Sequence, residues 1–469
     1  MKGKRLTVAG LMMLAISAVV AATAAAGGPF WSHSDATARA VASALKNKHP
    51  KNVIFLLGDG MGTQEITAAR YYQGVGNPLN VDRMPFTGFD TTWSVKPGAA
   101  APYLPDYDPD SASTGSAWAT GQKTIDERIS QGPSSALEVP GPNLKTILEL
   151  AQKEGKKVGD VSTAEITDAT PAVLASHISQ RGCQGPANMG ACASETKAAG
   201  GLGSIAEQMV DHKVDVLLGG GRARFTAKVA GGPDDGKTVV EEATELGYRY
   251  VTDADGLSTV GAGKPVLGLF NDSNMSLEWS GPAASLGKGN APVPCTEGQR
   301  PANEPSLAAM TRRAIDLLDS RGNRKGFFLQ VEGASIDKQD HATNACGQLG
   351  ETIAFDRAIG VALDYQEANP DTLVVVTADH SHTSQIVGED AGGTGLPTGY
   401  STNLTTKDGQ TLSLTYGTAG YEAGKAPAAV PPSQQHTGAA VPVWAAGPGG
   451  LAVLGTNDHT DLFTTLSGR

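Results

Sequence analysis

Short apolar runs recur along the chain, and most of them end at glycine. They occupy Asn52–Gly60, Val214–Gly221, Gly326–Gly333, Thr372–His380 and Val441–Gly447. Continuous apolar runs of this length are typical of strands buried on both faces of a parallel sheet. Segments with helical periodicity lie between them, including Asn143–Gly155 and Ser306–Arg321. This alternation predicts an α/β fold with a doubly wound, mostly parallel central sheet and helices on both faces.

The first 26 residues have a different pattern. Lys2, Lys4 and Arg5 precede an apolar stretch that ends in alanines near Ala24–Ala26. This arrangement predicts a secretory signal over residues 1–26, and its small terminal residues favour cleavage over the alternative, an uncleaved membrane anchor. No later stretch approaches the roughly 18 unbroken apolar residues of a membrane-spanning helix. We therefore expect an exported chain without a membrane anchor after cleavage.

Beyond the signal we expect an N-terminal arm at 27–50, with a short helix at Ala36–Leu45, and a catalytic domain at 51–469. Within that domain, residues 390–435 are rich in Gly, Thr and Pro and contain short alternating runs. Such a composition favours turns and loops. We predict a small β excursion and a flexible surface loop there, not a separate domain.

The charge is acidic. The chain has 37 Lys and Arg residues against 48 Asp and Glu residues, a formal net charge of −11, and loss of the signal would remove three positive charges. This balance argues against a nucleic-acid partner, because phosphate-backbone binding requires a basic surface. An anionic substrate would need a local positive centre, which metal ions commonly supply.

The chain has four cysteines, and none forms a C-x-x-C pair: Cys183, Cys192, Cys295 and Cys346. In an exported chain they predict two disulfides with three possible connectivities. We favour Cys183–Cys192, which closes a short local loop, together with Cys295–Cys346. Disulfides indicate an oxidising compartment such as a periplasm or the cell exterior.

Acidic and imidazole side chains gather where the predicted strands end. These are Asp59, Glu332, Asp337, His341, Asp379 and His380, with His436 ahead of the last predicted strand. Ligands of open α/β sheets bind outside the carboxyl ends of the strands. Carboxylates with imidazoles suit Zn²⁺, and oxygen ligands alone suit Mg²⁺. Each residue alone is more often a helix cap, a turn or a surface pair, so their convergence carries the metal prediction.

The other histidines are predicted to be structural. His177 lies within a helical pattern, His382 is a candidate supporting residue, and the rest lie outside any acidic cluster: His33, His49, His212 and His459. Gly219–Gly221 lacks the order of a nucleotide-binding loop and is interpreted as a turn.

Asp110 and Ser111 precede a helix-compatible segment that runs to Trp118. The ordinary interpretation of such a pair is a helix N-cap. A serine nucleophile needs a base or a metal to activate it, and Ser111 has neither a G-x-S-x-G context nor a recognisable triad order. A metal ion can activate such a hydroxyl directly, and the family resemblance described next implies that Ser111 is a nucleophile as well as a cap position.

Six motifs occur in an order that resembles bacterial alkaline phosphatases: GDGMG, DSASTGSAWATG, STAEITDATPA, QVEGASIDKQDHA, TADHSHTSQIV and QHTG. The resemblance extends over nearly all of residues 50–465, and the four cysteines resemble the two-disulfide pattern of periplasmic members. The N-terminal arm and residues 390–435 match the family poorly.

The resemblance implies two Zn²⁺ ions and one Mg²⁺ ion. One zinc would be bound by Asp337, His341 and His436, and the other by Asp59, Asp379 and His380. The magnesium would be bound by Asp59, Thr170 and Glu332, with Asp168 supporting its waters. Arg181, expected at the end of a helix, would bind the phosphate together with Lys338 and Asp110.

The resulting hypothesis is a periplasmic or secreted phosphomonoesterase, which acts on phosphate monoesters through a phosphoserine and also transfers phosphate to alcohols. Inorganic phosphate would be its product, and the resemblance implies a homodimer. The enzymatic alternatives are a phosphodiesterase, a phosphonate hydrolase or a sulfatase of the same superfamily. A non-catalytic phosphate- or zinc-binding protein is the alternative from a different class.

Overall fold

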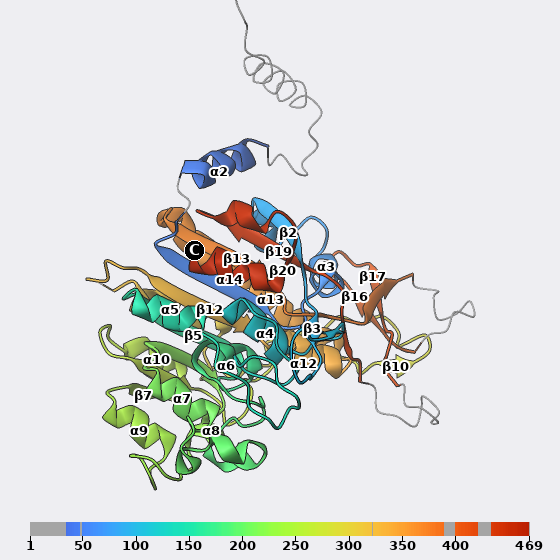
Figure 1. Cartoon of the computed structure of the whole chain (residues 1–469). Helices are drawn as coiled ribbons and strands as arrows, with labels where there is room; N and C mark the ends of the chain where they lie inside the picture. Colours follow the sequence, from blue (N-terminus) through green and yellow to red (C-terminus); the bar gives the residue numbers. More distant parts are fainter. Residues whose placement is uncertain (1–33, 47–48, 321, 389–398, 421–432, 469) are drawn as a thin grey trace, which may run out of the picture.

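A ten-stranded sheet runs through the centre of the molecule (Figure 1). The computed structural model describes residues 34–46, 49–320, 322–388, 399–420 and 433–468. The strand order is β20-β2-β19-β13-β1-β12-β5-β6-β8-β7. In chain order these strands are β1 (Asn52–Gly58), β2 (Phe86–Thr91), β5 (Lys157–Glu165), β6 (Val216–Gly220), β7 (Arg249–Val251), β8 (Val266–Leu269), β12 (Phe327–Gly333), β13 (Thr372–Thr377), β19 (Val441–Ala446) and β20 (Gly455–Asp458).

All five apolar runs form strands of this sheet, as predicted. They are β1, β6, β12, β13 and β19. β1 lies between β12 and β13 and is parallel to both, whereas β19 is antiparallel to its neighbours β13 and β2. The mostly parallel sheet is therefore confirmed, with β19 as the reversed strand.

Sequence patterning missed several strands, of which β5 matters most for the site. β5 pairs with β12 and β6 in the middle of the sheet, yet its sequence, KVGDVSTAE, is largely polar. Its buried Asp160 and Ser162 break the apolar run that identified the other strands. The missed strands β2, β7, β8 and β20 are short or lie toward the sheet edges.

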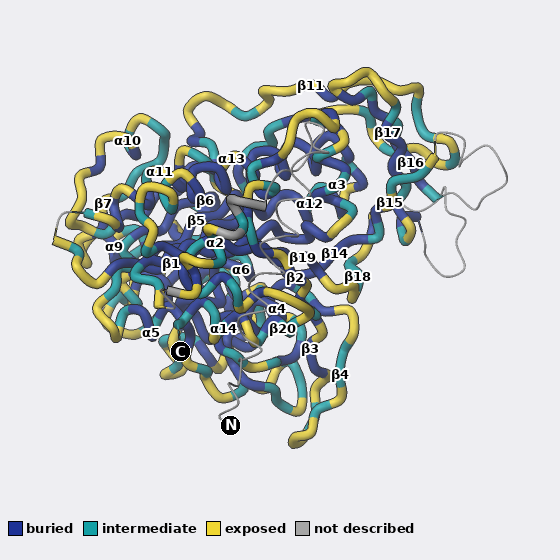
Figure 2. Tube along the Cα trace, turned by 90° about the horizontal axis from the view of Figure 1, so that it is seen from above, coloured by how far each residue is buried: buried dark blue, intermediate teal, exposed yellow. Residues whose placement is uncertain are grey.

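Helices cover both faces of the sheet. Alternate residues of each strand point to opposite faces, so each strand contributes to two hydrophobic cores, one under each layer of helices. Ile54 and Leu56 of β1 belong to the core that also contains residues of α3, α11 and α13. Phe55 and Leu57 belong to the opposite core, with residues of α4, α5, α6, α7 and α14. Figure 2 shows the central strands as deeply buried. These helices are α3 (Thr63–Tyr72), α4 (Ser111–Thr120), α5 (Ile147–Lys153), α6 (Ala169–Ala175), α7 (Ile205–Asp211), α11 (Leu307–Leu318), α13 (Ala345–Ala368) and α14 (His459–Ser467).

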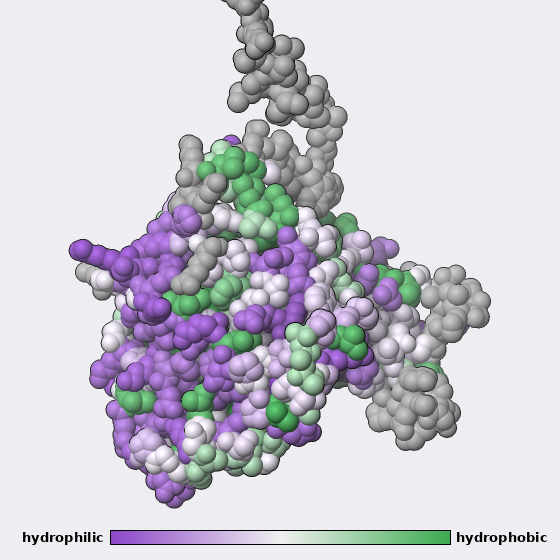
Figure 3. All heavy atoms as spheres, viewed as in Figure 1, coloured by the Kyte–Doolittle hydropathy of each residue, from purple (hydrophilic) through white to green (hydrophobic). Residues whose placement is uncertain are grey.

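The predicted helices at Asn143–Gly155 and Ser306–Arg321 correspond to α5 and α11, and the helix in the arm corresponds to α2 (Ser34–Lys46). Hydrophobic residues gather over α2 at the top of the face seen in Figure 3.

One helix prediction is wrong at its end. α6 stops at Ala175, because Ser176 adopts an extended conformation and Ile178 pairs with Ile129. His177 and Arg181 therefore lie in a loop, not in the helix.

Two strands lie within the predicted β excursion, β16 and β17, and they belong to a four-stranded sheet of order β10-β16-β17-β15, whose other two strands lie outside residues 390–435. Its strands are β10 (Ser285–Leu286), β15 (Ser384–Val387), β16 (Tyr400–Thr405) and β17 (Thr411–Tyr416), and Figure 1 shows it beside the main sheet. Residues 389–398 and 421–432 of the predicted loop, and the predicted signal, lie outside the described residues. Among the described residues, no helix is both long and apolar enough to cross a membrane.

The favoured disulfide connectivity is confirmed: Cys183 is bonded to Cys192, and Cys295 to Cys346. The first closes a loop just after Arg181. The second ties the segment around β11 (Thr296–Glu297) to the first turn of α13.

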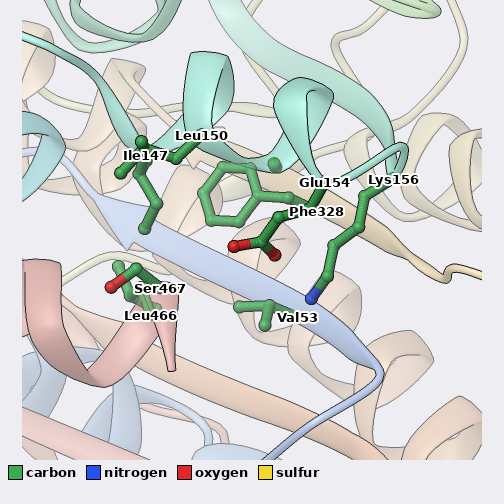
Figure 4. Close-up of a pocket in the computed structure, with 9 residues that line it drawn as sticks. Val53, Ile147, Leu150, Glu154, Lys156, Phe328, Leu466 and Ser467 are labelled. Carbon is green, nitrogen blue, oxygen red and sulfur yellow. The ribbon is translucent and has the colours of Figure 1, made fainter. Parts of the chain in front are cut away.

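Figure 4 shows a pocket between α5 and α14. Val53 and Phe328, which line it, lie at the amino ends of β1 and β12. The predicted site residues follow the carboxyl ends of the same strands. This pocket is therefore a feature of the opposite edge of the sheet.

Candidate active site

The carboxyl ends of three neighbouring strands deliver the first acidic side chains. Asp59 follows β1, Glu332 lies at the end of β12, and Asp379 follows β13. The register places Leu57 opposite both Glu332 and Thr377, so these ends lie at one level of the sheet.

Gly60 turns the chain sharply after Asp59. It has φ +67°, and a Cβ there would lie 2.7 Å from Cδ2 of His382. Its N–H donates to Asp379 Oδ1 over 2.9 Å. Only glycine combines this backbone conformation with so close an approach.

Ser111 is the first residue of α4 and is buried. The cap itself is Asp110, whose Oδ1 accepts from the Ser113 N–H over 3.0 Å. The expectation that Ser111 is the cap is therefore wrong by one residue. Because Asp110 performs that role, the Ser111 hydroxyl is available to contact His380, with its Oγ 3.3 Å from Nε2.

Asp59, Asp379 and His380 form one cluster. His380 Nε2 lies 3.6 Å from Asp59 Oδ1 and 3.2 Å from Asp379 Oδ2. Burial, then the charges of Asp337 and Asp379, raise the pKa of Asp59, and burial lowers the pKa of His380. Asp59 Oδ1 is buried and has no hydrogen-bond partner in the described part of the chain. A cation would relieve this accumulation of buried carboxylates, and the oxygen and nitrogen ligands fit zinc.

A second cluster contains Asp337, His341, His382 and His436. Asp337 and His341 lie one turn apart in α12 (Ser335–His341), as predicted, with Nε2 of His341 3.4 Å from Asp337 Oδ1. His382 and His436 pair across the two short strands β14 (Ser381–His382) and β18 (His436–Thr437). The His382 Nε2 lies 2.6 Å from Asp337 Oδ1, which makes it a direct partner of this carboxylate.

The ring orientations in this cluster are set by backbone carbonyls. Nδ1 of His341 donates to Gln434 O over 2.7 Å, and Nδ1 of His436 donates to Pro109 O over 3.1 Å. The two Nε2 atoms then lie 2.9 Å apart. Burial lowers the pKa of His436, but the hydrogen bond and the charge of Asp337 outweigh burial and raise this pKa to about 8. Two imidazole nitrogens at this separation need a shared proton or a metal ion, and carbonyl-anchored imidazoles are typical of metal ligands.

A third group surrounds Glu332. Ser162 Oγ donates to Glu332 Oε2, and the buried Thr170 of α6 lies beside the same carboxylate. Burial raises the pKa of Glu332 to about 7. The oxygen ligands of this group fit magnesium. Ser162 was not singled out as a site residue, although it is the first residue of the STAEITDATPA motif.

Arg181 is held between two carboxylates. Its Nη1 lies 3.1 Å from Asp110 Oδ2, and its Nη2 lies 2.9 Å from Asp168 Oδ1. The Lys338 ammonium lies 2.8 Å from Asp168 Oδ2. Burial opposes ionisation of Asp168, but the charges of Lys338 and Arg181 outweigh it and lower its pKa. The guanidinium is therefore fixed in orientation beside the N-terminus of α4.

The structure thus brings all the predicted metal and phosphate ligands into this one region. It also corrects one prediction about the remaining histidines. His212 does have an acidic neighbour, since its Nε2 and that of His177 each lie 3.6 Å from Glu149 Oε1. These residues are far apart in sequence, and no local pattern indicated that they meet.

A family model described as alkaline phosphatase matches residues 50–468. The chain belongs to the alkaline phosphatase family. It is 45% identical to streptomycin-6-phosphate phosphatase of Streptomyces griseus, over 92% of this chain and 93% of that protein. It is 43% identical to the alkaline phosphatase of Escherichia coli K12, over 94% of this chain and 90% of that protein. The chain is accordingly a phosphomonoesterase of a metal-dependent family.

Solved alkaline phosphatases share the fold. The Thermus thermophilus enzyme superposes with a TM-score of 0.64 at 22% identity, covering 91% of this chain and 93% of that one. The enzyme of the Antarctic bacterium TAB5 has a TM-score of 0.62 at 24% identity, covering 90% and 97%. A variant of the TAB5 enzyme has been solved with magnesium in its M3 site.

Proposed function

We propose that this alkaline phosphatase hydrolyses phosphate monoesters through a covalent phosphoserine at Ser111. The observation that carries the proposal is the contact of the buried Ser111 hydroxyl with His380, a member of a carboxylate–imidazole cluster. A serine in this position has a candidate metal ligand as its immediate neighbour. No such neighbour is needed for a helix cap, and Asp110 already performs that role.

The proposed metal ligands follow the three groups. Asp337, His341 and His436 would hold one zinc ion, and Asp59, Asp379 and His380 the second. Asp59, Thr170 and Glu332 would hold magnesium, with Asp168 near its waters. Bound in this way, the metals would supply Lewis-acid stabilisation of the attacking and leaving oxygens of the phosphoryl group.

The chain's own residues account for the remaining steps. Ser111 Oγ loses its proton and attacks phosphorus, the ester P–O bond breaks, and the alcohol leaves after taking up a proton. Water then loses a proton and attacks the phosphoserine, the P–Oγ bond breaks, the seryl oxygen takes up a proton, and inorganic phosphate is released. An alcohol in place of water would yield a new phosphate ester, so the mechanism includes phosphotransfer.

Arg181 would bind the phosphoryl oxygens in both steps. A guanidinium matches two phosphate oxygens with parallel N–H donors, and Asp110 and Asp168 hold it in place before substrate arrives. The first N–H groups of α4 add a positive pole at the same position. Lys338, paired with Asp168, would reach phosphate through water.

We also propose export to a periplasm or the cell exterior, and a homodimer. The basic and apolar N-terminal sequence and the two disulfides support export. The dimer rests on the family resemblance, and light scattering of the purified mature chain tests it.

Rapid acid quenching during turnover tests the phosphoserine. Mass spectrometry of the quenched protein should locate phosphate on Ser111. Substrate preference is tested in parallel with a chromogenic phosphate monoester, the matching diester, the matching sulfate and streptomycin 6-phosphate. Faster hydrolysis of the diester, or net inversion at a chirally labelled phosphorus, would overturn the proposal.

A further inference from the structure

Three metal-binding side chains meet on the helical layer that contains α5, α6 and α7. Glu149 lies in α5, His177 follows α6, and His212 is the C-cap of α7. Their ligand atoms lie within 4.8 Å of one another. His177 is 6% exposed, Glu149 13% and His212 25%, so the cluster is shielded but reachable from solvent. None of the three belongs to the candidate active site.

Hydrogen bonds fix the orientation of both imidazoles. Nδ1 of His177 lies 2.9 Å from Ser130 O, and Nδ1 of His212 lies 3.0 Å from Gln208 O. Carbonyl oxygens only accept, so each Nδ1 carries the proton. In the neutral rings, both Nε2 atoms therefore present lone pairs to the Glu149 carboxylate, 3.6 Å away.

The backbone around the three residues is cross-linked, which holds the group in place. The Thr146 hydroxyl donates to Leu174 O over 2.7 Å and joins α5 to α6. The Gln152 side chain donates to His212 O over 2.7 Å and joins α5 to the end of α7. Gln208 Oε1 accepts from the His177 N–H over 2.8 Å.

We propose that Glu149, His177 and His212 bind a Zn²⁺ ion, with water as the fourth ligand, at a site separate from the catalytic metals. Two imidazoles and one carboxylate are an established zinc ligand set. Magnesium and calcium prefer oxygen ligands, so the two nitrogen ligands disfavour these ions. Tetrahedral zinc with ligands at 2.0–2.1 Å places ligand atoms about 3.3 Å apart. The two imidazole–carboxylate separations of 3.6 Å need only a small contraction, and the two imidazole ligand atoms lie within 4.8 Å of each other and must approach by no more than about 1.5 Å.

A proton is the competing occupant. Burial lowers the pKa of His212, but its interaction with Glu149 raises it above the ordinary value, so a charged His212 would also satisfy the carboxylate. Lys145 is a further competitor, with Nζ 3.1 Å from Glu149 Oε1. Its side chain is 61% exposed, and it can leave the carboxylate without losing solvation.

Zinc here would have a structural effect with a link to the active site. It would join α5, α7 and the loop from Ser176 to Arg181. The guanidinium of Arg181, at the end of this loop, is proposed to bind phosphate. The ion would brace that loop without touching substrate.

Zinc counting on the full-length mature protein tests this proposal. Wild type and variants are equilibrated at equal micromolar free zinc with excess magnesium, and bound zinc per chain is measured by mass spectrometry of the metal. We expect His212→Asn to bind one zinc fewer than wild type, to keep its phosphatase activity, and to lose part of the zinc-dependent rise in melting temperature. Glu149→Gln should lose the same zinc. His49→Asn, an exposed histidine outside the cluster, should retain it.

Lys145→Ala separates zinc from a plain Glu–His ion pair. Removal of the competing ammonium should tighten zinc binding at this site, so that the additional zinc is acquired at a lower free concentration. Equal zinc content in wild type, His212→Asn and Glu149→Gln would overturn the proposal.

Discussion

Ser111 Oγ and His380 Nε2 lie 3.3 Å apart, and this contact joins the first turn of α4 to the residue pair that follows β13. The two residues are distant in sequence and belong to different layers of the fold. The contact places the N-terminus of α4, a helix whose residues are all buried, beside the residues that follow β13. The proposed nucleophile and its proposed metal ligand are positioned by the same packing.

Ser111→Ala should abolish the phosphoenzyme and the transfer of phosphate to an added amino alcohol, and reduce hydrolysis by roughly 10³-fold or more. Ser113→Ala is the matched control, because the Ser113 hydroxyl contacts Asp126 and the Asp110 carbonyl instead of His380. It should retain transfer. Product analysis by phosphorus NMR measures both. Undiminished transfer in Ser111→Ala would return Ser111 to a purely structural role.

Arg181→Ala should weaken inhibition by inorganic phosphate by about tenfold to a hundredfold, because charge-assisted hydrogen bonds are worth roughly 1.5–3 kcal/mol. The phosphoserine should still form. The phosphate inhibition constant of Arg181→Lys should lie between those of wild type and Arg181→Ala, because an ammonium cannot bridge Asp110 and Asp168 as the guanidinium does. Inhibition constants and the yield of transfer product measure these effects. An unchanged inhibition constant in Arg181→Ala would exclude its role in phosphate binding.

Removal of metals should abolish activity, and zinc with magnesium should restore it better than either alone. Thr170→Val keeps the side-chain shape but removes the hydroxyl beside Glu332. This variant should need more magnesium for full activity and bind as much zinc as wild type. Activity that survives exhaustive chelation, with metal content verified by mass spectrometry, would contradict the metal assignment.

The two disulfides should differ in their contributions to stability. Cys295–Cys346 spans 51 residues and Cys183–Cys192 spans nine. Loop-closure entropy alone predicts losses of about 4 and about 2.6 kcal/mol in the free energy of unfolding when each is replaced by alanines. Denaturant unfolding measures both. The shorter loop lies beside Arg181, so its loss should also weaken phosphate inhibition, whereas loss of the longer one should not.

Glu351→Gln should change how stability depends on pH. Glu351 is buried, and its Oε1 accepts from the Glu278 N–H over 2.9 Å. Burial raises its pKa from 4.5 to about 8. The folded chain therefore holds a proton that the unfolded chain releases, and the associated stability is complete below pH 4.5 and declines toward pH 8.

Glutamine keeps the acceptor and does not titrate. The free energy of unfolding of Glu351→Gln relative to wild type should therefore rise across this pH window. Denaturant unfolding at its two ends measures the difference. A constant difference between variant and wild type would show that the Glu351 pKa is not raised.

The sequence could predict the strands that are apolar throughout, because burial on both faces leaves a continuous signal in β1, β6, β12, β13 and β19. It could also indicate where the site lies, since Asp59, Glu332 and Asp379 follow or end such strands. It could not reveal β5. Buried polar residues of that strand make tertiary contacts, such as that of Ser162 with Glu332, which no local pattern encodes.

Two further differences between the sequence-based prediction and the structure also arise from tertiary contacts. The segment around His177 has helical periodicity, yet tertiary pairing of Ile178 with Ile129 pulls it into an extended conformation before Arg181. The meeting of Glu149, His177 and His212 depends on how three helices pack side by side. Contacts between elements decide both features, whereas the patterns read from sequence describe single elements.

The position of β1 between β12 and β13 has a consequence for how the chain acquires its fold. The strand at the middle of the sheet is synthesised first, and both of its partners emerge only much later. An emerging chain therefore carries an apolar segment, NVIFLLG, without a partner for most of its synthesis. Such non-local pairing slows folding and exposes intermediates to aggregation. A delay of this kind would suit the proposed export, because a chain must stay unfolded while it crosses a membrane, and β1 has both of its partners only when residue 377 has been made.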